Sequence, residues 1–224
     1  PPAGAGGPDD IYNTVDRIGW VQIDTLQMVH RSQYLVLWSR LGDYDPAQFD
    51  ALLSGGGDHG TGRRLYEYWL HAACLVPLTE YRYSLPVARK YRERRMPGWY
   101  RHWIDEPGNR DLVARVSNHI RDNGPTRSAD FDHGGPKRGS WWDWKPAKRA
   151  LEYLYDSGEL MIAKRASFQR VYDTRDRVLP DWVSLQEPSE PEATRHLLER
   201  SLTALGACDL KRVADYASLT GATV

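Results

Sequence analysis

Cysteine is scarce in this chain of 224 residues, with only Cys74 and Cys208. Their spacing fits neither a metal-ligand pair nor a disulfide framework, which favours a reducing, intracellular setting. Apolar runs are short, and none approaches the roughly 20 residues of a membrane-spanning helix. Residues 1–8 are rich in Gly and Pro and have no positive charge or apolar segment, so they do not resemble a signal peptide. We therefore expect a cytoplasmic protein without a membrane partner.

Net charge is lacking as well, because 30 Lys and Arg balance 30 Asp and Glu. The overall charge favours no class of partner, so only the distribution of charge along the chain is informative. Nine Trp residues are expected in the core or on a binding face. The length suffices for one large or two small domains with a substantial core.

The stretch from Trp20 to Thr25 follows a predicted helix over residues 9–18 that ends at Gly19. In an extended strand its apolar residues enter the core, while Gln22 and Asp24 project together from the other face, about 7 Å apart. A carboxylate beside a neutral amide can orient water or stabilise a developing cation. The pattern therefore makes Gln22 and Asp24 candidate catalytic residues.

Asp24 also has a structural interpretation. Asp is a favoured helix N-cap, and residues 25–30 are compatible with a helix that Asp24 would cap. Both interpretations remain open at this point.

The rest of the first half alternates short elements. We expect a helix over residues 46–53, a strand over 63–69 and a buried turn or short helix over 71–77. His71 alone is more typical of a hydrogen-bonded core histidine than of a catalytic one. The basic run over residues 89–95 is typical of a solvated helix face, although it also suits phosphate.

The second half has the element order of a winged helix. It predicts a helix over residues 109–123, a short second element over 126–131, a third helix over 145–157 and a β-hairpin over 159–173. In a winged helix the third helix approaches DNA and the hairpin forms the wing. Helices over 193–205 and 209–218 resemble the opening of a further helix-turn-helix.

Positive charge gathers in this winged helix. From Lys137 to Arg175 nine basic residues stand against five acidic ones. Such an excess attracts phosphate independently of sequence. Phe168, at the hairpin tip, is either an apolar wedge that disturbs base stacking or a core-facing residue of a plain wing.

In combination, six stretches resemble a known family, the bacterial winged-helix DNA glycosylases of the AlkZ/YcaQ type. They are residues 19–24 (GWVQID), 34–42 (YLVLWSRLG), 66–73 (YEYWLHAA), 139–152 (GSWWDWKPAKRALE), 168–173 (FQRVYD) and 177–180 (RVLP). The family's catalytic motif is Gln-apolar-Gln or Gln-apolar-Asp, and Gln22-Ile23-Asp24 matches the second form. Gln33 stands where the family often has His close to the site. With Gln33, the residues Tyr66, Glu67 and His71 are candidate site-supporting residues.

The resemblance implies a mainly α fold with short β-hairpins, built of tandem winged-helix units around a basic channel, with a hairpin pushed into the duplex. We expect a first unit with the catalytic motif at residues 1–105, a second with the basic helix and wing at 106–183, a linker at 184–192 and the start of a third unit at 193–224. The family's opening helix and its C-terminal β-domain are expected to be missing.

The implied activity is hydrolysis of the N-glycosidic bond of N7-alkylated guanine, including interstrand crosslinks, by a monofunctional glycosylase. The implied partner is duplex DNA with alkylated or crosslinked guanine, bound by a monomer without metal or organic cofactor. The candidate DNA-binding residues are Lys145, Lys148, Arg149, Lys164, Arg165, Phe168 and Arg170.

Two other classes of function remain open. A non-catalytic tandem winged-helix regulator would prefer one DNA sequence or a palindrome, whereas a glycosylase would prefer damaged DNA of any sequence. An RNA-binding module is a weaker alternative, because the sequence has no RNP-type or KH-type motif.

Overall fold

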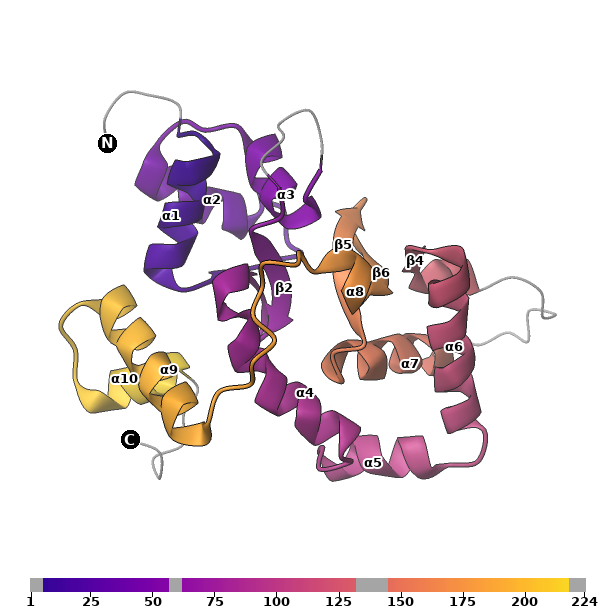
Figure 1. Ribbon diagram of the computed structural model, residues 1–224. Coiled ribbons are helices and arrows are strands. Elements are labelled where there is room, and N and C mark those ends of the chain that lie inside the picture. The colour runs from indigo at the N-terminus through magenta and orange to yellow at the C-terminus, as the bar shows by residue number, and fades with distance from the viewer. Residues whose placement is uncertain (1–5, 57–61, 132–144, 218–224) are drawn as a thin grey trace. The chain divides into compact units, whose positions relative to one another are not determined.

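The computed structural model describes residues 6–56, 62–131 and 145–217 (Figure 1). Its contacts divide the chain into two compact units. Unit 1 comprises Pro1–Tyr83 and Ser184–Val224, and unit 2 comprises Ser84–Val183. Among the described residues, no helix has both the length and the apolar character needed to cross a membrane.

Unit 1 begins with a winged helix, in which a helix and a short strand precede two helices and a hairpin. Its elements are α1 (Pro8–Ile18), β1 (Val21–Gln22), α2 (Ser32–Leu41), α3 (Pro46–Ser54), β2 (Leu65–Trp69) and β3 (Ala73–Pro77). The strands form an antiparallel sheet in the order β1-β3-β2. This arrangement places β1, with Gln22, at one edge of the sheet.

The termini of α1 and α3 follow from local chemistry. The backbone N–H of Gly7 donates to the Asp10 carboxylate at 3.1 Å, and α1 ends at Gly19, whose φ of +85° suits a residue without Cβ. Asp45 caps α3 by accepting the N–H of Ala47 at 2.9 Å, and Pro46 occupies the first turn. The predicted helices over residues 9–18 and 46–53 are confirmed.

The prediction of a turn or short helix over residues 71–77 is wrong. Ala73–Pro77 is the central strand β3, and Cys74, Leu75 and Val76 are buried in it. A strand covered on both faces loses the alternation of polar and apolar residues, so its sequence resembles that of a buried helix. The predicted strand over residues 63–69 is confirmed as β2.

Unit 2 contains a second winged helix, and the element order predicted for it is confirmed. The winged helix consists of α6 (Asn109–Asn123), β4 (Thr126–Arg127), the 3-10 helix η2 (Ser128–Phe131), α7 (Lys145–Asp156), β5 (Leu160–Ala166) and β6 (Gln169–Thr174). Its sheet has the order β4-β6-β5. The predicted loop over residues 132–139 and the motif residues 139–144 lie outside the described residues.

Two helices precede this winged helix, α4 (Leu85–Arg92) and α5 (Gly98–Asp105), and α8 (Arg175–Val178) follows it. Tyr100, Trp103 and Ile104 of α5 join one buried cluster with Val116 and Ile120 of α6. Residues 84–105 therefore group with unit 2, whereas the sequence interpretation assigned them to the first unit.

The last two described helices, α9 (Glu190–Leu205) and α10 (Leu210–Ala217), belong to unit 1. Helix α9 begins three residues earlier than expected, because Ser189 accepts the N–H of Glu192 and Pro191 lies in the first turn. The end of the expected linker is thus helical.

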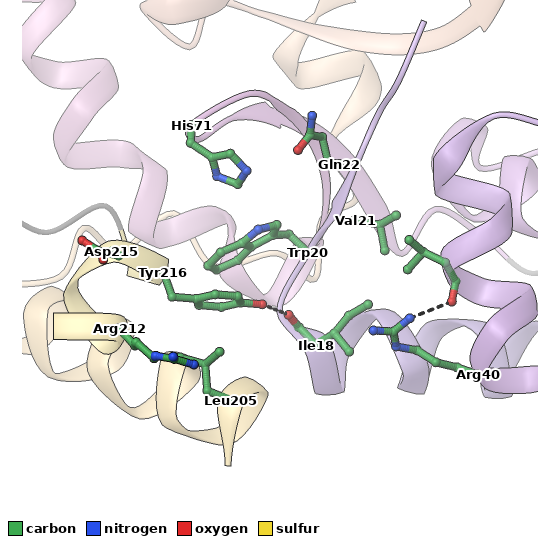
Figure 2. A pocket seen from close by; sticks show the side chains of 11 residues that line it. Ile18, Trp20, Val21, Gln22, Arg40, His71, Leu205, Arg212, Asp215 and Tyr216 are labelled. Carbon is green, nitrogen blue, oxygen red and sulfur yellow. Dashed lines mark hydrogen bonds between the residues drawn. The ribbon is translucent and has the colours of Figure 1, made fainter. Parts of the chain in front are cut away.

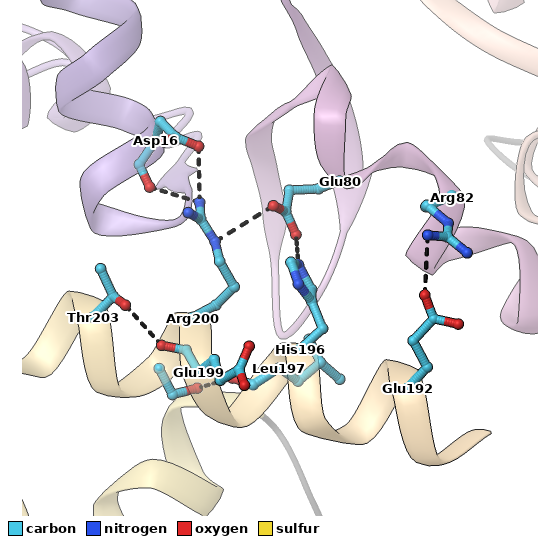
Figure 3. Close-up of polar contacts among 10 residues, drawn as sticks. Asp16, Glu80, Arg82, Glu192, His196, Leu197, Glu199, Arg200 and Thr203 are labelled. Carbon is cyan, nitrogen blue, oxygen red and sulfur yellow. Dashed lines mark hydrogen bonds and ion pairs between the residues drawn. The ribbon is translucent and has the colours of Figure 1, made fainter. Parts of the chain in front are cut away.

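Polar side chains hold α9 against the first half of unit 1 (Figure 3). His196 pairs with Glu80 of the 3-10 helix η1 (Leu78–Ser84), and Arg200 donates to the backbone oxygen of Asp16 at 2.6 Å and lies 3.2 Å from its carboxylate. Arg82 pairs with Glu192 at 3.0 Å. Residues 184 positions apart in sequence, Asp16 and Arg200, are thus neighbours within unit 1.

Candidate functional site

The edge strand β1 orients the candidate catalytic motif. Val21 lies opposite Leu75 and Gln22 opposite Cys74, and the N–H of Ile23 donates to the Ala73 oxygen at 2.8 Å. Val21 and Ile23 are buried, whereas Gln22 is exposed. The predicted alternation is confirmed over these three residues.

Asp24 follows the strand and is held by two hydrogen bonds. Its backbone N–H donates to Oε1 of Gln33 at 3.2 Å, and its Oδ1 accepts the N–H of Leu26 at 2.9 Å. Residues 25–30 form no helix, so the predicted helix cap is wrong. A carboxylate has several acceptor positions, and Oδ2 has no hydrogen-bond partner among the residues that the structure describes. Asp24 therefore retains acceptor capacity for water or substrate.

The side chain of Arg31 joins the two ends of the segment that follows Asp24. Its Nη1 donates to the backbone oxygen of Thr25 at 2.8 Å and lies 3.5 Å from that of Asp24. The sequence analysis did not single out Arg31, because no local pattern indicates that a side chain will bind backbone six residues earlier. The contact brings a positive charge close to the backbone of Asp24.

A pocket of about 640 Å³ opens beside Gln22 in unit 1 (Figure 2). The residues that line it include Trp20, Gln22, Arg40, His71, Arg212 and Tyr216. Figure 2 shows the Trp20 ring between His71 and Tyr216. Trp20 stacks on Tyr216 with ring centroids 4.4 Å apart, and its ring lies 6.3 Å from that of His71. Gln22 thus faces an aromatic pocket, while Asp24 is not among the residues that line it.

The thiol beside the motif is not a nucleophile. Cys74 lies opposite Gln22 in the sheet and is fully buried. Burial raises the pKa of Cys74 to about 12, so the thiol keeps its proton at neutral pH. Burial also raises the pKa of the Tyr216 phenol, which donates to the Ile18 backbone oxygen.

Two of the four candidate supporting residues lie beside a residue of the motif, and the other two do not. Gln33 lies beside Asp24, and His71 lines the pocket with Gln22. Tyr66 and Glu67 lie buried in β2, where the Tyr66 ring meets that of Tyr81 at 5.3 Å. Neither of the latter lines the pocket beside Gln22.

The candidate DNA-binding residues lie in unit 2. Lys148 and Arg149 are exposed on α7, where Lys148 lies 3.9 Å from Glu152. The side chain of Lys145 lies outside the described residues. Lys164 is exposed on β5.

At the hairpin tip, Ser167 and Phe168 have φ of +47° and +66°, as both central residues of a type I′ turn require. The Arg165 guanidinium lies 4.5 Å from the centre of the Phe168 ring, and its Nη1 donates to the Phe168 oxygen at 2.8 Å. Arg170 lies 5.6 Å from the Tyr155 ring. Phe168 is half-buried under Arg165 and does not belong to the core cluster of unit 2.

Within residues 6–56, 62–131 and 145–217, no three His, Cys, Asp or Glu side chains come close enough to hold a metal ion.

The chain contains two winged helices with the same order of elements, and the polar motif begins on the edge strand of the first. It is therefore a mainly helical tandem winged-helix protein. A family model described as DNA glycosylase AlkZ-like matches residues 15–224, and the chain belongs to this family. Among solved structures it is similar to the Streptomyces sahachiroi DNA glycosylase AlkZ, with 16% sequence identity and a TM-score of 0.53. The match covers 97% of this chain and 60% of that glycosylase, so the chain spans less than two thirds of that protein's length.

Proposed function

We propose that this chain is a DNA glycosylase that hydrolyses the N-glycosidic bond of N7-alkylated guanine, including guanines in interstrand crosslinks. One observation carries the proposal: in a member of the AlkZ-like family, Gln22 lies exposed on the edge strand β1 and Asp24 follows two residues later, while Val21 and Ile23 are buried. The proposed setting is the cytoplasm, and the proposed acting form is a monomer on duplex DNA.

The chemistry of the lesion suits a carboxylate and an amide. N7 alkylation makes guanine a cation that leaves as a neutral base, so no general acid is needed. The site must stabilise an oxocarbenium-like sugar and deliver water. Asp24 supplies the negative charge and accepts a proton from the attacking water, while the Gln22 amide positions water or substrate. Without a lysine nucleophile, the product is an abasic site.

The surroundings of Asp24 support this role by limiting its motion. Gln33 holds the backbone N–H of Asp24, and the N–H of Leu26 holds one carboxylate oxygen. A side chain fixed in this way loses less conformational freedom on reaching the transition state. The exposed basic residues of α7 and of the wing would hold phosphates without reading sequence.

The test is release of N7-methylguanine from methylated duplex DNA by the chain and its Asp24→Asn and Gln22→Ala variants. We expect Asp24→Asn to lower excision by at least about a hundredfold, because charge stabilisation is lost, while DNA affinity stays near that of the parent. Asp45→Asn is the matched control, because it changes a carboxylate outside the motif to another good helix cap. A parent chain without excision activity would contradict the proposal.

A non-catalytic DNA-binding protein is the second candidate. The hydrogen bond from the Leu26 N–H to Asp24 favours it, because it gives the carboxylate a structural use. In that case Asp24→Asn would change folding stability and DNA binding together, and the parent would bind undamaged and methylated duplexes equally.

A further inference from the structure

The segment after Asp24 carries the most exposed apolar side chains of the described chain. Leu26, Met28 and Val29 are 71%, 94% and 88% exposed. Every other large apolar side chain among the described residues is at most 59% exposed, the value for Trp38. Single exposed apolar residues are common on protein surfaces, but three highly exposed apolar side chains within four positions indicate a binding partner.

This exposed segment has fixed ends. Arg31 joins the end of the loop to Thr25 at its start, as described above. The His30 ring packs edge-on against Tyr34 of α2, with ring centroids 4.7 Å apart. The backbone at the base of the loop is therefore held in place, while its apolar side chains extend into solvent.

The loop is also joined directly to the candidate catalytic carboxylate. The backbone nitrogen of Leu26 lies 2.9 Å from Oδ1 of Asp24. Any nucleotide whose sugar comes within reach of Asp24 must therefore come close to Leu26. This position favours DNA, rather than another protein, as the partner of its apolar side chains.

We propose that residues 25–31 form an apolar wedge, with Leu26, Met28 and Val29 packing between bases at the step next to the lesion. The inference rests on the proposed function, since it takes Asp24 as the group that meets the damaged nucleotide. Apolar side chains that enter a base step partly unstack it and kink the duplex. The wedge opens the duplex beside a guanine that is too bulky or too constrained to leave the stack freely.

The experiment places 2-aminopurine, whose fluorescence rises on unstacking, next to a single N7-methylguanine in a duplex. It compares Asp24→Asn with Asp24→Asn that also carries Leu26→Ser, Met28→Ser and Val29→Ser. At saturating protein we expect fluorescence to rise about threefold or more with the intact loop and to stay near that of free DNA with the substituted loop. Anisotropy confirms that both variants are bound, and circular dichroism confirms that both are folded.

Asp24→Asn with Leu185→Ser is the matched control, because Leu185 is an exposed apolar residue of unit 1 far from the motif in sequence. It should retain the full fluorescence increase. An equal increase with the intact and the substituted loop, or no increase with either, would overturn the wedge.

The excision assay separates this inference from the proposed function. If the parent excises the base and the fluorescence increase is the same with the intact and the substituted loop, the wedge is wrong and the glycosylase proposal stands. If the parent does not excise the base but the fluorescence increase requires the intact loop, the glycosylase proposal is wrong and the wedge stands.

Discussion

At the scale of single residues, the contact between Gln33 and Asp24 links the stability of unit 1 to the proposed chemistry. Gln33 is 4% exposed, and its side-chain oxygen accepts the Asp24 N–H. The hydrogen bond joins the first turn of α2 to the end of β1, so the position of the carboxylate depends on the helix that follows it.

We predict that Gln33→Leu lowers both stability and excision. A partly buried N–H left without its acceptor costs about 1–3 kcal/mol of folding free energy, and a displaced Asp24 should lower kcat by about tenfold. Urea unfolding and single-turnover excision measure the two effects. Gln33→His retains a ring-nitrogen acceptor and should recover part of both. Unchanged kcat in Gln33→Leu would contradict a positioning role.

Asp156, at the end of α7, makes the stability of unit 2 depend on pH. Its carboxyl has a pKa raised to about 6, mainly by burial and also by the charge of Glu152, while a hydrogen bond from Tyr100 and the charge of Arg170 act in the opposite direction. Between pH 4 and 6 the unfolded chain therefore loses this proton while the folded chain keeps it. Stability falls as pH rises through this window, because the folded state binds more protons.

We predict that Asp156→Asn stabilises unit 2 at pH 7 by about 1–2 kcal/mol, a value reduced for partial solvent screening. The variant and the parent should approach equal stability near pH 4, where both side chains are neutral. Urea unfolding at several pH values between 4 and 7.5 measures this difference. Asp122→Asn, at an exposed carboxyl of α6, is the control. A constant difference across the pH range would contradict the assignment.

At the scale of elements, a network of charged side chains joins α9 to the first half of unit 1. Arg200 contacts Asp16 and lies 3.5 Å from Glu80, and His196 pairs with Glu80 while stacking on Tyr83 at 3.7 Å. Figure 3 shows this network of Arg200, His196, Glu80 and Asp16. All four side chains are partly shielded from solvent. Removal of one partner from such a network leaves another charge uncompensated.

We predict that Arg200→Met loosens α9 and α10 without unfolding unit 2. The chain should become sensitive to limited proteolysis between residues 184 and 209, and mass spectrometry of the fragments locates the cleavage. The expected loss of stability is about 2–4 kcal/mol. Arg195→Met, on the exposed side of the same helix, should leave the cleavage pattern unchanged. Equal protease resistance of both variants would show that apolar contacts alone hold α9.

At the scale of the whole molecule, the chain has no net charge, so its affinity for DNA must come from local charge. Lys148 and Arg149 are exposed on α7, and Lys164 is exposed on the wing. Each phosphate that a basic residue neutralises releases counterions, so binding should weaken steeply as salt increases.

We predict that the double substitution Lys148→Ala and Arg149→Ala reduces the slope of log affinity against log salt by about 1–2. The loss should be the same for methylated and undamaged duplexes, because phosphate contacts carry no information about the base. Anisotropy titrations between low and moderate salt measure the slope. The control is Arg115→Ala and Arg121→Ala, at exposed positions of α6. A slope unchanged by the α7 substitutions would remove this helix from the DNA-binding surface.

Local patterns determined much of this fold. The glycine and proline boundaries of α1 and α3, the apolar periodicity of α6 and α7 and the hairpin of β5 and β6 were all predictable, because each depends on residues close together in the chain. The buried strand β3 was not, because its sequence is equally suited to a helix.

The candidate site likewise has features that the sequence predicts and features that only the folded structure shows. The sequence by itself determined the motif Gln22-Ile23-Asp24 and the side of the strand on which Gln22 lies. Only the tertiary structure brought Gln33 to the Asp24 N–H and Tyr216 to the Trp20 ring. Alternation along a strand is a property of neighbouring residues, whereas these contacts exist because the folded backbone brings distant segments together, and no periodicity in the sequence records them.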